Sequence, residues 1–477
     1  MRLMRRSLGR KSFILVLATL LLHAGAADAQ RPATTAVPSS REAVRQSFAP
    51  IVKRTAPAVV NVFSRRVVEN RSPFQNDPFF RRFFGDAFRL ALPRERVLNS
   101  LGSGVILDAS GLIVTNYHVI NGAQEITVVL NDRREFSATV LLSDEQLDLA
   151  ALKIDVGKER LPVLEIGDSD ALQVGDLVLA IGNPFGVGQT VTTGIVSALA
   201  RTGIGLGTFG SYIQTDAAIN PGNSGGALVD LDGHLVGINT AIYSESGGSV
   251  GIGFAIPTGL VRAVLAAVAK GQHLVARPWL GVNGEGVTAD AARKLGLPHP
   301  IGLQITDVAA GSPAGGAGLI TGDVILAIDG HDIDDTDGMR FRLATLGVGA
   351  PAALTVWHGG TTRTVKVTLA AAPDQPARDV SELPPGNPLT GVSAGNLNPA
   401  FAEEVNLPQN ARGVIVVAVT SGSPAARLGV QNGDLIIEIN SHKIANVAQL
   451  KSLLTQSKSP WTIVLRRGNR TFTAVVR

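Results

Sequence analysis

The last third of this 477-residue chain repeats a motif, and the repeat constrains the fold more than any other feature. Residues 311–314 read Gly-Ser-Pro-Ala and are followed by a Gly-Asp pair at 322–323; the same letters recur at 422–425 and 433–434. Each copy continues with a short strand pattern, a helical stretch and closing strands. Two copies of about a hundred residues are too few and too long for a solenoid, so we predict two tandem domains.

The region before the repeat has a different pattern. Residues 102–256 consist of short β runs broken by Gly, Asn and Asp, which is typical of an all-β barrel or sandwich. A helical pattern follows at 257–270. Between the two copies, a stretch rich in Pro, Ala and Asp predicts a linker. We therefore expect a first domain at 40–271, repeat domains at 272–372 and 387–477, and a linker at 373–386.

Residues 222–226 read Gly-Asn-Ser-Gly-Gly and carry the strongest chemical signal. A glycine before a serine lets the backbone approach a substrate and direct N–H groups at a developing oxyanion. Taken alone, the motif is equally an ordinary polar loop between strands.

Two residues upstream strengthen the catalytic interpretation. His118 follows a β-rich run, and Asp148 begins an apolar run. Each alone is more often structural, as a strand-end histidine or as a capping aspartate. The order His118, Asp148, Ser224 is one of the orders in which serine hydrolases place their triad. Together the three residues predict a serine nucleophile with a base and an orienting carboxylate.

The N-terminus predicts export. Residues 1–12 are basic, residues 13–22 are apolar but too short to span a bilayer, and residues 27–29 read Ala-Asp-Ala. We predict a signal peptide over residues 1–29, cleaved after Ala29. A membrane anchor is the less favoured alternative because the apolar run is short.

The composition also limits the types of active site, cofactor and binding partner that the chain could have. The chain has no cysteine, which excludes thiolate metal sites and a cysteine nucleophile. Its eight histidines form no zinc motif, and no phosphate-binding loop is present, so we expect no metal and no cofactor. The net charge of +4 comes without a basic stripe interleaved with aromatic residues, which gives no support for nucleic-acid binding.

Residues 65–96 are rich in arginine and contain six phenylalanines. The pattern is too irregular to predict a strand. Two alternatives stay open: a loop that buries its phenylalanines on a partner, or a local helix that packs its own phenylalanine face.

Five motifs together carry a resemblance. Their residues are 115–119 (Thr-Asn-Tyr-His-Val), 148–150 (Asp-Leu-Ala), 182–186 (Gly-Asn-Pro-Phe-Gly), 220–226 and 253–257. They resemble the HtrA/Deg family of exported serine proteases with two PDZ domains. This resemblance implies a mainly β fold, with a chymotrypsin-like double β-barrel followed by two α+β PDZ domains, and a periplasmic location.

The resemblance also implies the role of each site residue. Ser224 would be the nucleophile, His118 the general base and then acid, and Asp148 the group that orients the imidazole. The N–H groups of Gly222 and Ser224 would form the oxyanion hole.

The resemblance extends to two peptide-binding loops. In PDZ domains such a loop holds the carboxylate of a peptide that adds a strand to the sheet edge. The matching residues here are Trp279, Leu280, Gly281 and Val282 in the first domain, and Leu389, Thr390, Gly391 and Val392 in the second. For Trp279, a core aromatic at a domain junction is the structural alternative.

Three uncharged residues bear on specificity and activation. Ala218 and Ile219 lie where such proteases floor the primary pocket, so we expect cleavage after small or medium aliphatic residues. Asn223 precedes the nucleophile and has no charge to pair with a newly cleaved N-terminus. We therefore expect activity without N-terminal trimming beyond the leader.

These observations predict an ATP-independent endopeptidase that degrades misfolded or damaged proteins and recognises their C-termini. The resemblance implies a homotrimer and larger homo-oligomers, and the sequence gives no sign of a membrane span in the mature chain. The alternative function is a chaperone or peptide-binding scaffold with a silent protease site. A PDZ adaptor without enzymatic chemistry would leave His118 and Asp148 unexplained.

Overall fold

The computed structural model describes residues 47–69, 95–183, 188–202, 211–242, 249–405, 407, 410–468 and 470–476. It divides the chain into Met1–Pro50 and Ile51–Arg477, and a helix α2 spans Ala49–Thr55. The expected signal peptide lies outside the described residues. Among the described residues, no helix combines the length and apolar content needed to cross a membrane.

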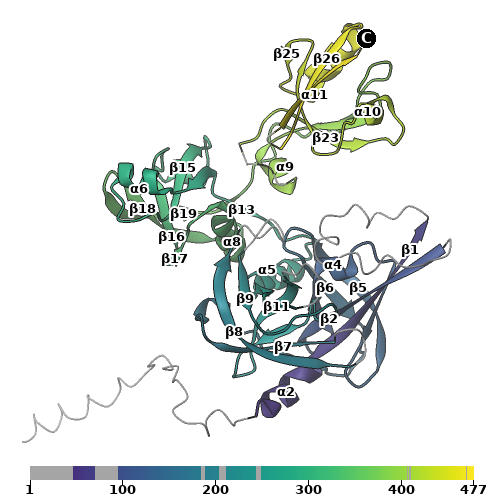
Figure 1. Cartoon of the computed structure of the whole chain (residues 1–477), viewed down its shortest axis with the longest axis vertical. Helices are drawn as coiled ribbons and strands as arrows, with labels where there is room; N and C mark the ends of the chain where they lie inside the picture. The colour runs from purple at the N-terminus through teal and green to yellow at the C-terminus, as the bar shows by residue number, and fades with distance from the viewer. Residues whose placement is uncertain are drawn as a thin grey trace, which may run out of the picture. The chain divides into compact units, whose positions relative to one another are not determined.

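Six strands form the first closed barrel, in the order β1-β2-β3-β6-β5-β4 (Figure 1). Their buried side chains alternate along β4, as a half-buried strand requires, and converge on an aliphatic core that includes Ile113, Val128 and Leu152. The strands are β1 (Val59–Glu69), β2 (Glu95–Asp108), β3 (Leu112–Thr115), β4 (Glu125–Val129), β5 (Glu135–Asp144) and β6 (Leu149–Ile154).

Six more strands form a second closed barrel, in the order β10-β11-β12-β9-β8-β7. It has its own core, which includes Val178, Ile213 and Leu228, and helix α5 (Thr258–Ala269) follows it as predicted. The strands are β7 (Leu177–Gly182), β8 (Thr190–Arg201), β9 (Tyr212–Thr215), β10 (Ala227–Val229), β11 (Leu235–Ile242) and β12 (Gly253–Pro257). Two barrels followed by two mixed domains confirm the predicted mainly β fold class.

The expectation of no strand over residues 65–96 was wrong at both ends. β1 continues to Glu69 and β2 starts at Glu95, and the two strands pair without a shift, with Val67 opposite Val97. Charged side chains break the apolar alternation here, but backbone pairing with the neighbouring strand does not depend on it. Residues 70–94 lie outside the described part of the chain, so both alternatives for the phenylalanines stay untested.

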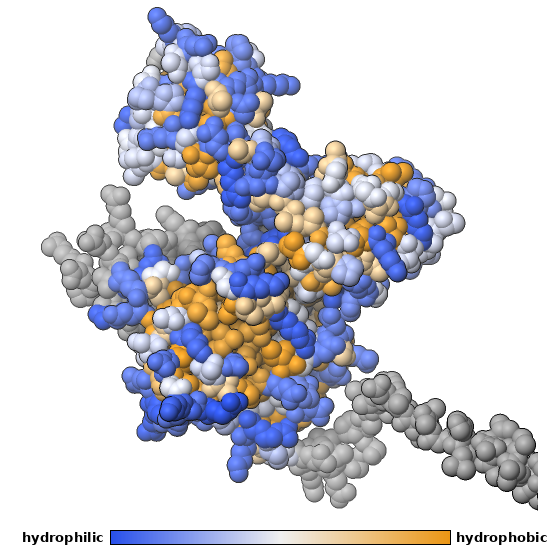
Figure 2. Space-filling model, turned by 180° about the vertical axis from the view of Figure 1, so that it is seen from behind, coloured by the Kyte–Doolittle hydropathy of each residue, from blue (hydrophilic) through white to orange (hydrophobic). Residues whose placement is uncertain are grey.

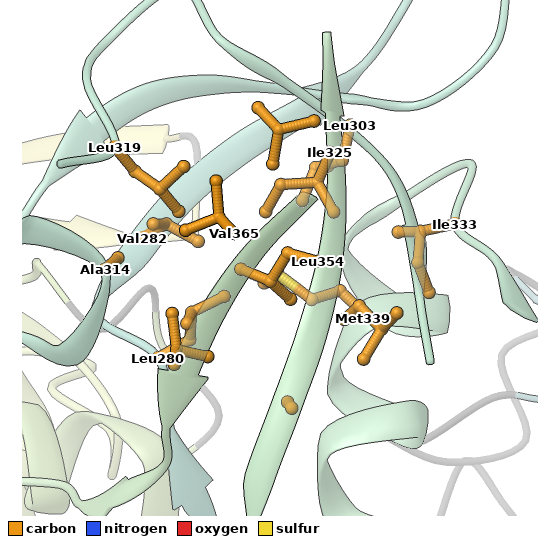
Figure 3. Close-up of a cluster of buried hydrophobic side chains, with 14 of the residues drawn as sticks. Leu280, Val282, Leu303, Ala314, Leu319, Ile325, Ile333, Met339, Leu354 and Val365 are labelled. Atoms are coloured by element: carbon orange, nitrogen blue, oxygen red, sulfur yellow. The ribbon is translucent and has the colours of Figure 1, made fainter. Parts of the chain in front are cut away.

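The first repeat domain is a sheet in the order β14-β15-β16-β18-β19 with helices packed on it. Figure 3 shows its core, where Leu280 and Val282 meet Met339 and Leu354. A two-stranded sheet joins β13 (Pro278–Trp279) to β20 (Ala370–Ala371). The other elements are β14 (Val282–Gly286), α6 (Ala289–Leu295), β15 (Leu303–Val308), α7 (Pro313–Gly316), β16 (Val324–Ile328), β17 (His331–Asp332), α8 (Thr336–Leu346), β18 (Pro351–His358) and β19 (Thr361–Thr368).

The second repeat domain has the same strand order with one strand added in front: β21-β22-β23-β24-β26-β27. The added strand lies within the predicted linker, at Ser381–Glu382. The elements are β21 (Ser381–Glu382), β22 (Val392–Asn396), α9 (Pro399–Glu404), β23 (Val414–Val419), α10 (Pro424–Arg427), β24 (Leu435–Ile439), β25 (His442–Lys443), α11 (Val447–Gln456), β26 (Trp461–Arg467) and β27 (Arg470–Val476).

The repeated Gly-Ser-Pro-Ala motif starts a short helix in each domain. Ser312 caps α7 by accepting from Gly315 N, and Ser423 caps α10 by accepting from Ala426 N. Proline occupies the first helical position in both helices, where its missing N–H costs nothing.

The repeated Gly-Asp pair places a buried carboxylate in each domain. Asp434 is fully buried, and its Oδ2 accepts from Gln431 N at 2.8 Å. The Arg467 guanidinium donates to both oxygens, from Nε at 2.6 Å and from Nη2 at 2.8 Å. Asp323 has the same place in the first domain, beside Arg363 and His358. In each domain the aspartate therefore accepts a hydrogen bond that closes a turn. An arginine from the last β-hairpin of the domain compensates its negative charge.

We predict that Asp434→Ala destabilises the second repeat domain by roughly 2–3 kcal/mol. The change leaves the Arg467 guanidinium and a turn N–H without their acceptor. The loss of unfolding free energy stays below that for a fully buried ion pair because Arg467 is partly exposed. Urea unfolding followed by fluorescence of Trp461 measures the effect. Glu438→Ala on the adjacent β24 is the control, with an expected change below about 0.5 kcal/mol; equal losses in both variants would contradict the role of the ion pair.

Candidate active site

The turn around Ser224 leaves two backbone donors unused. Gly222 has φ of +103°, a conformation that favours glycine. Asn223 N donates to Asn220 O at 2.9 Å, and Gly225 N donates to Asn239 O at 2.8 Å. The N–H groups of Gly222 and Ser224, by contrast, donate to no acceptor within the described part of the chain. These are the two donors that the family resemblance implies for an oxyanion hole.

His118 and Asp148 meet in the first barrel. His118 lies in the short helix α4 (Tyr117–Ile120), and its Nδ1 is 2.9 Å from both carboxylate oxygens of Asp148. The His118 backbone N–H also donates to Asp148 Oδ1 at 3.0 Å. Asp148 has φ of +51°, which is strained for a residue with a side chain, and Asn116 Nδ2 holds its carbonyl at 2.9 Å. These contacts hold the imidazole in one orientation.

Thr240, which the sequence analysis did not single out, connects the two barrels at this site. Its Oγ1 donates to Asp148 Oδ2 at 2.6 Å, and its carbonyl accepts from Ser224 Oγ at 3.0 Å. The three predicted triad residues are therefore brought into one hydrogen-bonded cluster. The available signal was an Asn-Thr pair inside the otherwise apolar strand β11, which is too weak to use alone.

Ser103 in β2 is a second residue that the sequence analysis missed. It is fully buried, its N–H donates to Ser224 O at 2.8 Å, and its Oγ donates to Gly222 O at 2.7 Å while accepting from Asn183 N at 2.9 Å. The approach requires glycine at position 225, where a Cβ would lie 2.1 Å from Ser103 O. One serine therefore fixes the carbonyls on both sides of Asn223.

Asn223 is almost fully buried, and neither amide atom of its side chain has a partner in the described residues. The side chain forms none of the hydrogen bonds that define the turn. The expectation that activation needs no further N-terminal cleavage stays a prediction.

Ala218 and Ile219, the predicted floor of the primary pocket, precede the nucleophile turn. Ile219 is buried with Val178 and Val196 in the core of the second barrel, and Ala218 is half-buried with its carbonyl bonded to Thr192 Oγ1 at 2.8 Å. Both side chains are apolar.

Two tyrosines around the site stay protonated at neutral pH. Burial, with the charges of Glu145 and Asp148, raises the pKa of Tyr117. Burial raises the pKa of Tyr212 further, and its ring meets Phe254 edge to face at 6.2 Å. Neither phenol provides a base near neutral pH.

A group of potential metal ligands lies in the turn between β10 and β11. Asp230, Asp232 and His234 lie close enough to share an ion. Asp230 Oδ1 already accepts from the backbone N–H groups of Asp232 and His234, at 2.9 and 2.8 Å. These bonds explain the cluster as an aspartate-closed turn.

The first predicted peptide loop borders a pocket. Leu280 and Val282 line it with Met339 and Leu343, between β14 and α8. The N–H groups of Leu280 and Gly281 donate to no protein atom in the described residues. Trp279 is buried and pairs with Ala370, which matches the structural alternative for this residue.

The second predicted loop, residues 389–392, has a different environment. Leu389 and Val392 are fully buried, and the strand that follows them, β22, is paired on both edges. The loops themselves match, since Gly281 O accepts from Ala309 N and Gly391 O from Thr420 N, both at 2.8 Å. They differ in the strand that follows, because β14 ends its sheet in the described residues and β22 is paired on both edges.

Family models match three parts of the chain: a trypsin-like peptidase domain at residues 102–238, and PDZ domains at residues 278–369 and 415–467. The periplasmic pH-dependent serine endoprotease DegQ of Escherichia coli (strain K12) is 39% identical over 435 residues, covering 90% of this chain and 91% of DegQ. The periplasmic serine endoprotease DegP of Salmonella typhimurium (strain LT2) is 37% identical over 486 residues, covering 96% and 98%. A solved HtrA-type protease, AlgW with a decapeptide, is 46% identical, covers 69% of this chain and 99% of its own, and superposes with a TM-score of 0.51.

We predict that Ser103→Ala lowers kcat for peptide cleavage roughly tenfold to a hundredfold and changes KM by less than about twofold. The Gly222 carbonyl loses its donor, so the adjacent peptide can rotate and misplace the Gly222 N–H. Affinity for a peptide aldehyde, whose hemiacetal oxygen occupies the same position, should fall in parallel. Steady-state kinetics and inhibitor titration measure both effects.

Thr258→Val is the matched control for this prediction. Thr258 is fully buried, and its hydroxyl accepts from Ser169 N at 3.2 Å and donates to Gly167 O at 3.0 Å, the same pair of bonds that Ser103 makes. It should lower thermal stability and leave kcat unchanged. An equal fall in kcat for both variants would make Ser103 a structural residue only.

Proposed function

This chain belongs to the HtrA family of serine endopeptidases with PDZ domains, and on that basis we propose that it degrades misfolded or damaged proteins in the periplasm without ATP. The observation that carries the proposal is the cluster in which Asp148 holds His118 and, through Thr240, reaches Ser224 beside two unused N–H donors.

The proposed reaction proceeds through an acyl-enzyme. His118 takes the proton of Ser224 Oγ as this oxygen attacks the scissile carbonyl, and Asp148 stabilises the resulting imidazolium. The Gly222 and Ser224 N–H groups receive the negative oxygen of the tetrahedral intermediate. His118 then gives its proton to the leaving amine, and water releases the acyl group by the reverse sequence.

We propose that the first PDZ domain delivers substrates by their C-termini. Two features support this: the pocket between β14 and α8, and the unused N–H groups of Leu280 and Gly281 beside it. Apolar side chains line this pocket together with the charged residues Arg277, Arg340 and Glu403. A carboxylate bound at these donors would let the peptide extend along β14, the edge strand of its sheet. The solved relative AlgW was determined with a decapeptide.

We further propose a domain division with a leader over 1–29, the protease at 40–271 and PDZ domains at 272–372 and 387–477. The relatives DegQ and DegP described above are periplasmic proteases, which supports export of this chain.

A homotrimer formed through the protease domains is the proposed assembly. Hydrophobic residues gather over much of one face of the body that holds the barrels (Figure 2). Leu177 and Ile195, which lie opposite each other on β7 and β8, are exposed by 39% and 37%. Apolar areas of this kind favour association. Sedimentation equilibrium should give about three times the mass of one mature chain, and a single-chain mass would contradict the trimer.

We predict that Ser224→Ala abolishes cleavage of unfolded casein, lowering kcat at least about a thousandfold. His118→Ala should cost about as much, and the double variant little more, because the two residues act as a unit. Full activity of Ser224→Ala would remove Ser224 from its role. If the unchanged chain cleaves nothing yet suppresses aggregation of a denatured protein, the chaperone or scaffold function is correct instead.

The same casein digests test the pocket assigned to Ala218 and Ile219. Mass spectrometry of the products should show cleavage mainly after Val, Ala or Ile, because the pocket offers no charge to a basic side chain. Ala218→Asp should shift cleavage toward Lys and Arg. A profile dominated by Lys or Arg in the unchanged chain would contradict the assignment.

A further inference from the structure

A segment of the predicted linker lies along the sheet edge of the second PDZ domain. β21 pairs antiparallel with β22, with Ser381 opposite Ala394 and Glu382 opposite Ser393. Next to this pair, Leu383 N donates to the carbonyl oxygen of Val392, the first residue of β22, at 2.8 Å. The outer edge of β22 is therefore occupied by the chain itself.

The pairing continues toward the other end of β22. Asn396 N donates to Arg378 O at 2.6 Å, and Asn396 Nδ2 donates to Ala377 O at 2.9 Å. Asp379 has φ of +42°, which marks the irregularity between the two bonded stretches. In the first PDZ domain the equivalent strand, β14, is the end of its sheet in the described residues.

Leu383 occupies the position of a ligand's anchoring side chain. It is only 3% exposed and packs in the core cluster with Leu389 and Val392 of the loop and Leu450 of α11. PDZ ligands add an antiparallel strand at this edge and bury their last side chain between strand and helix. Leu383 makes both contacts from within the chain.

Part of the carboxylate loop of the second domain also has its donors engaged. Leu389 N donates to Asn387 Oδ1 at 2.9 Å, Thr390 N to Asn387 O at 3.1 Å, and Val392 N to Leu389 O at 3.1 Å. A free peptide carboxylate needs such N–H groups unbonded, as they are at Leu280 and Gly281 in the first domain. Of the two matching donors in the second domain, Thr390 N is engaged, while Gly391 N donates to no acceptor among the described residues. The bond of Thr390 N is independent of the strand pairing and also favours an occupied groove.

The residues before β21 are hydrogen-bonded to helix α9 and to Asn398, the residue that caps it. Arg378 donates to both oxygens of Glu404, at 2.6 and 2.7 Å, and its guanidinium lies 5.0 Å from the centre of the Phe401 ring. Asn398 Nδ2 donates to Pro376 O and to Asp374 Oδ1, both at 2.8 Å. The segment is thus bonded on two sides.

We propose that residues 379–383 (Asp-Val-Ser-Glu-Leu) are the resident ligand of the second PDZ domain's own peptide groove, so that this domain accepts a foreign C-terminus only when the segment leaves. The proposal rests on the proposed function only in taking this sheet edge as a peptide site. A short tether gives the segment an effective concentration on the order of millimolar, which a free peptide must exceed.

The test uses the full chain carrying Ser224→Ala and a synthetic peptide that ends in Asp-Val-Ser-Glu-Leu with a free carboxylate. Hydrogen exchange read by mass spectrometry reports on β22, and a fluorescence titration gives affinities. We expect the peptide to leave exchange at residues 392–396 unchanged in this parent. With Leu383→Ala, the same residues should gain protection and the apparent Kd for that site should fall at least about tenfold, because the open groove becomes more populated.

Two further variants test whether the effect of Leu383→Ala comes only from unfolding of the domain. Leu465→Ala removes the same side chain from the same core, on β26 away from the groove, and should create no peptide site. Arg378→Ala loosens the segment without altering that core, and should open the groove as Leu383→Ala does.

A disulfide lock completes the design. Glu382 and Ser393 form the cross-strand pair next to the bonded Leu383–Val392 pair, so their Cα atoms are close enough for a disulfide, and the chain has no other cysteine. In the Arg378→Ala variant, oxidised Glu382→Cys/Ser393→Cys should close the site, and dithiothreitol should reopen it.

Protection of residues 392–396 by peptide in the parent, at the affinity seen with Leu383→Ala, would overturn the proposal. So would the lack of a new site in both Leu383→Ala and Arg378→Ala. Failure of the first PDZ domain to bind peptide would show separately, as unchanged exchange at residues 282–286, and would count against the proposed function alone.

Discussion

The contact between Ser103 and the nucleophile turn is the interaction on which the site depends. The first barrel supplies His118 and Asp148, and the second supplies Ser224 and the two N–H groups proposed for the oxyanion hole, so neither barrel holds the complete proposed site. Ser103 crosses between them and bonds the carbonyls of Gly222 and Ser224. Since hydrogen bonds lose strength steeply with misalignment, these two bonds set the turn's position relative to the imidazole. Thr240 makes the return connection, from the second barrel to Asp148.

The sequence predicted the parts of this site that have a local signature. A glycine turn identified Ser224, and strand boundaries with polar residues identified His118 and Asp148. Ser103 and Thr240 have no such signature, because their roles arise from partners 119 and 92 residues away. The repeated serine-proline caps were visible for the opposite reason: Ser312 and Ser423 bond to residues only three positions ahead.

The fold shows the same division between local and long-range information. The Gly-Asp repeat predicted two related domains because each aspartate closes a turn within three residues. Residues 373–386 were predicted to be a linker because they are rich in proline. This composition gave no indication of strand β21. An edge strand needs few bonds, and here, in the described residues, only the Leu383 N–H, the Asn396 N–H and the Asn396 side-chain amide add to the two paired residues. Proline is tolerated at such edges, so composition cannot distinguish a free linker from a docked one.

The difference between the two PDZ domains changes how peptide binding adds up across an assembly. In the described residues β14 ends its sheet and β22 is paired on both edges. On the two proposals, each chain therefore offers one ready edge, and the second edge has to release its own segment first. Simultaneous binding of a long substrate then depends on the number of chains that are joined, because a second ready site lies on another chain. Avidity of this kind rises with effective concentration between sites. The protease domains, which would hold the chains together, therefore set the strength of substrate capture as well as the chemistry.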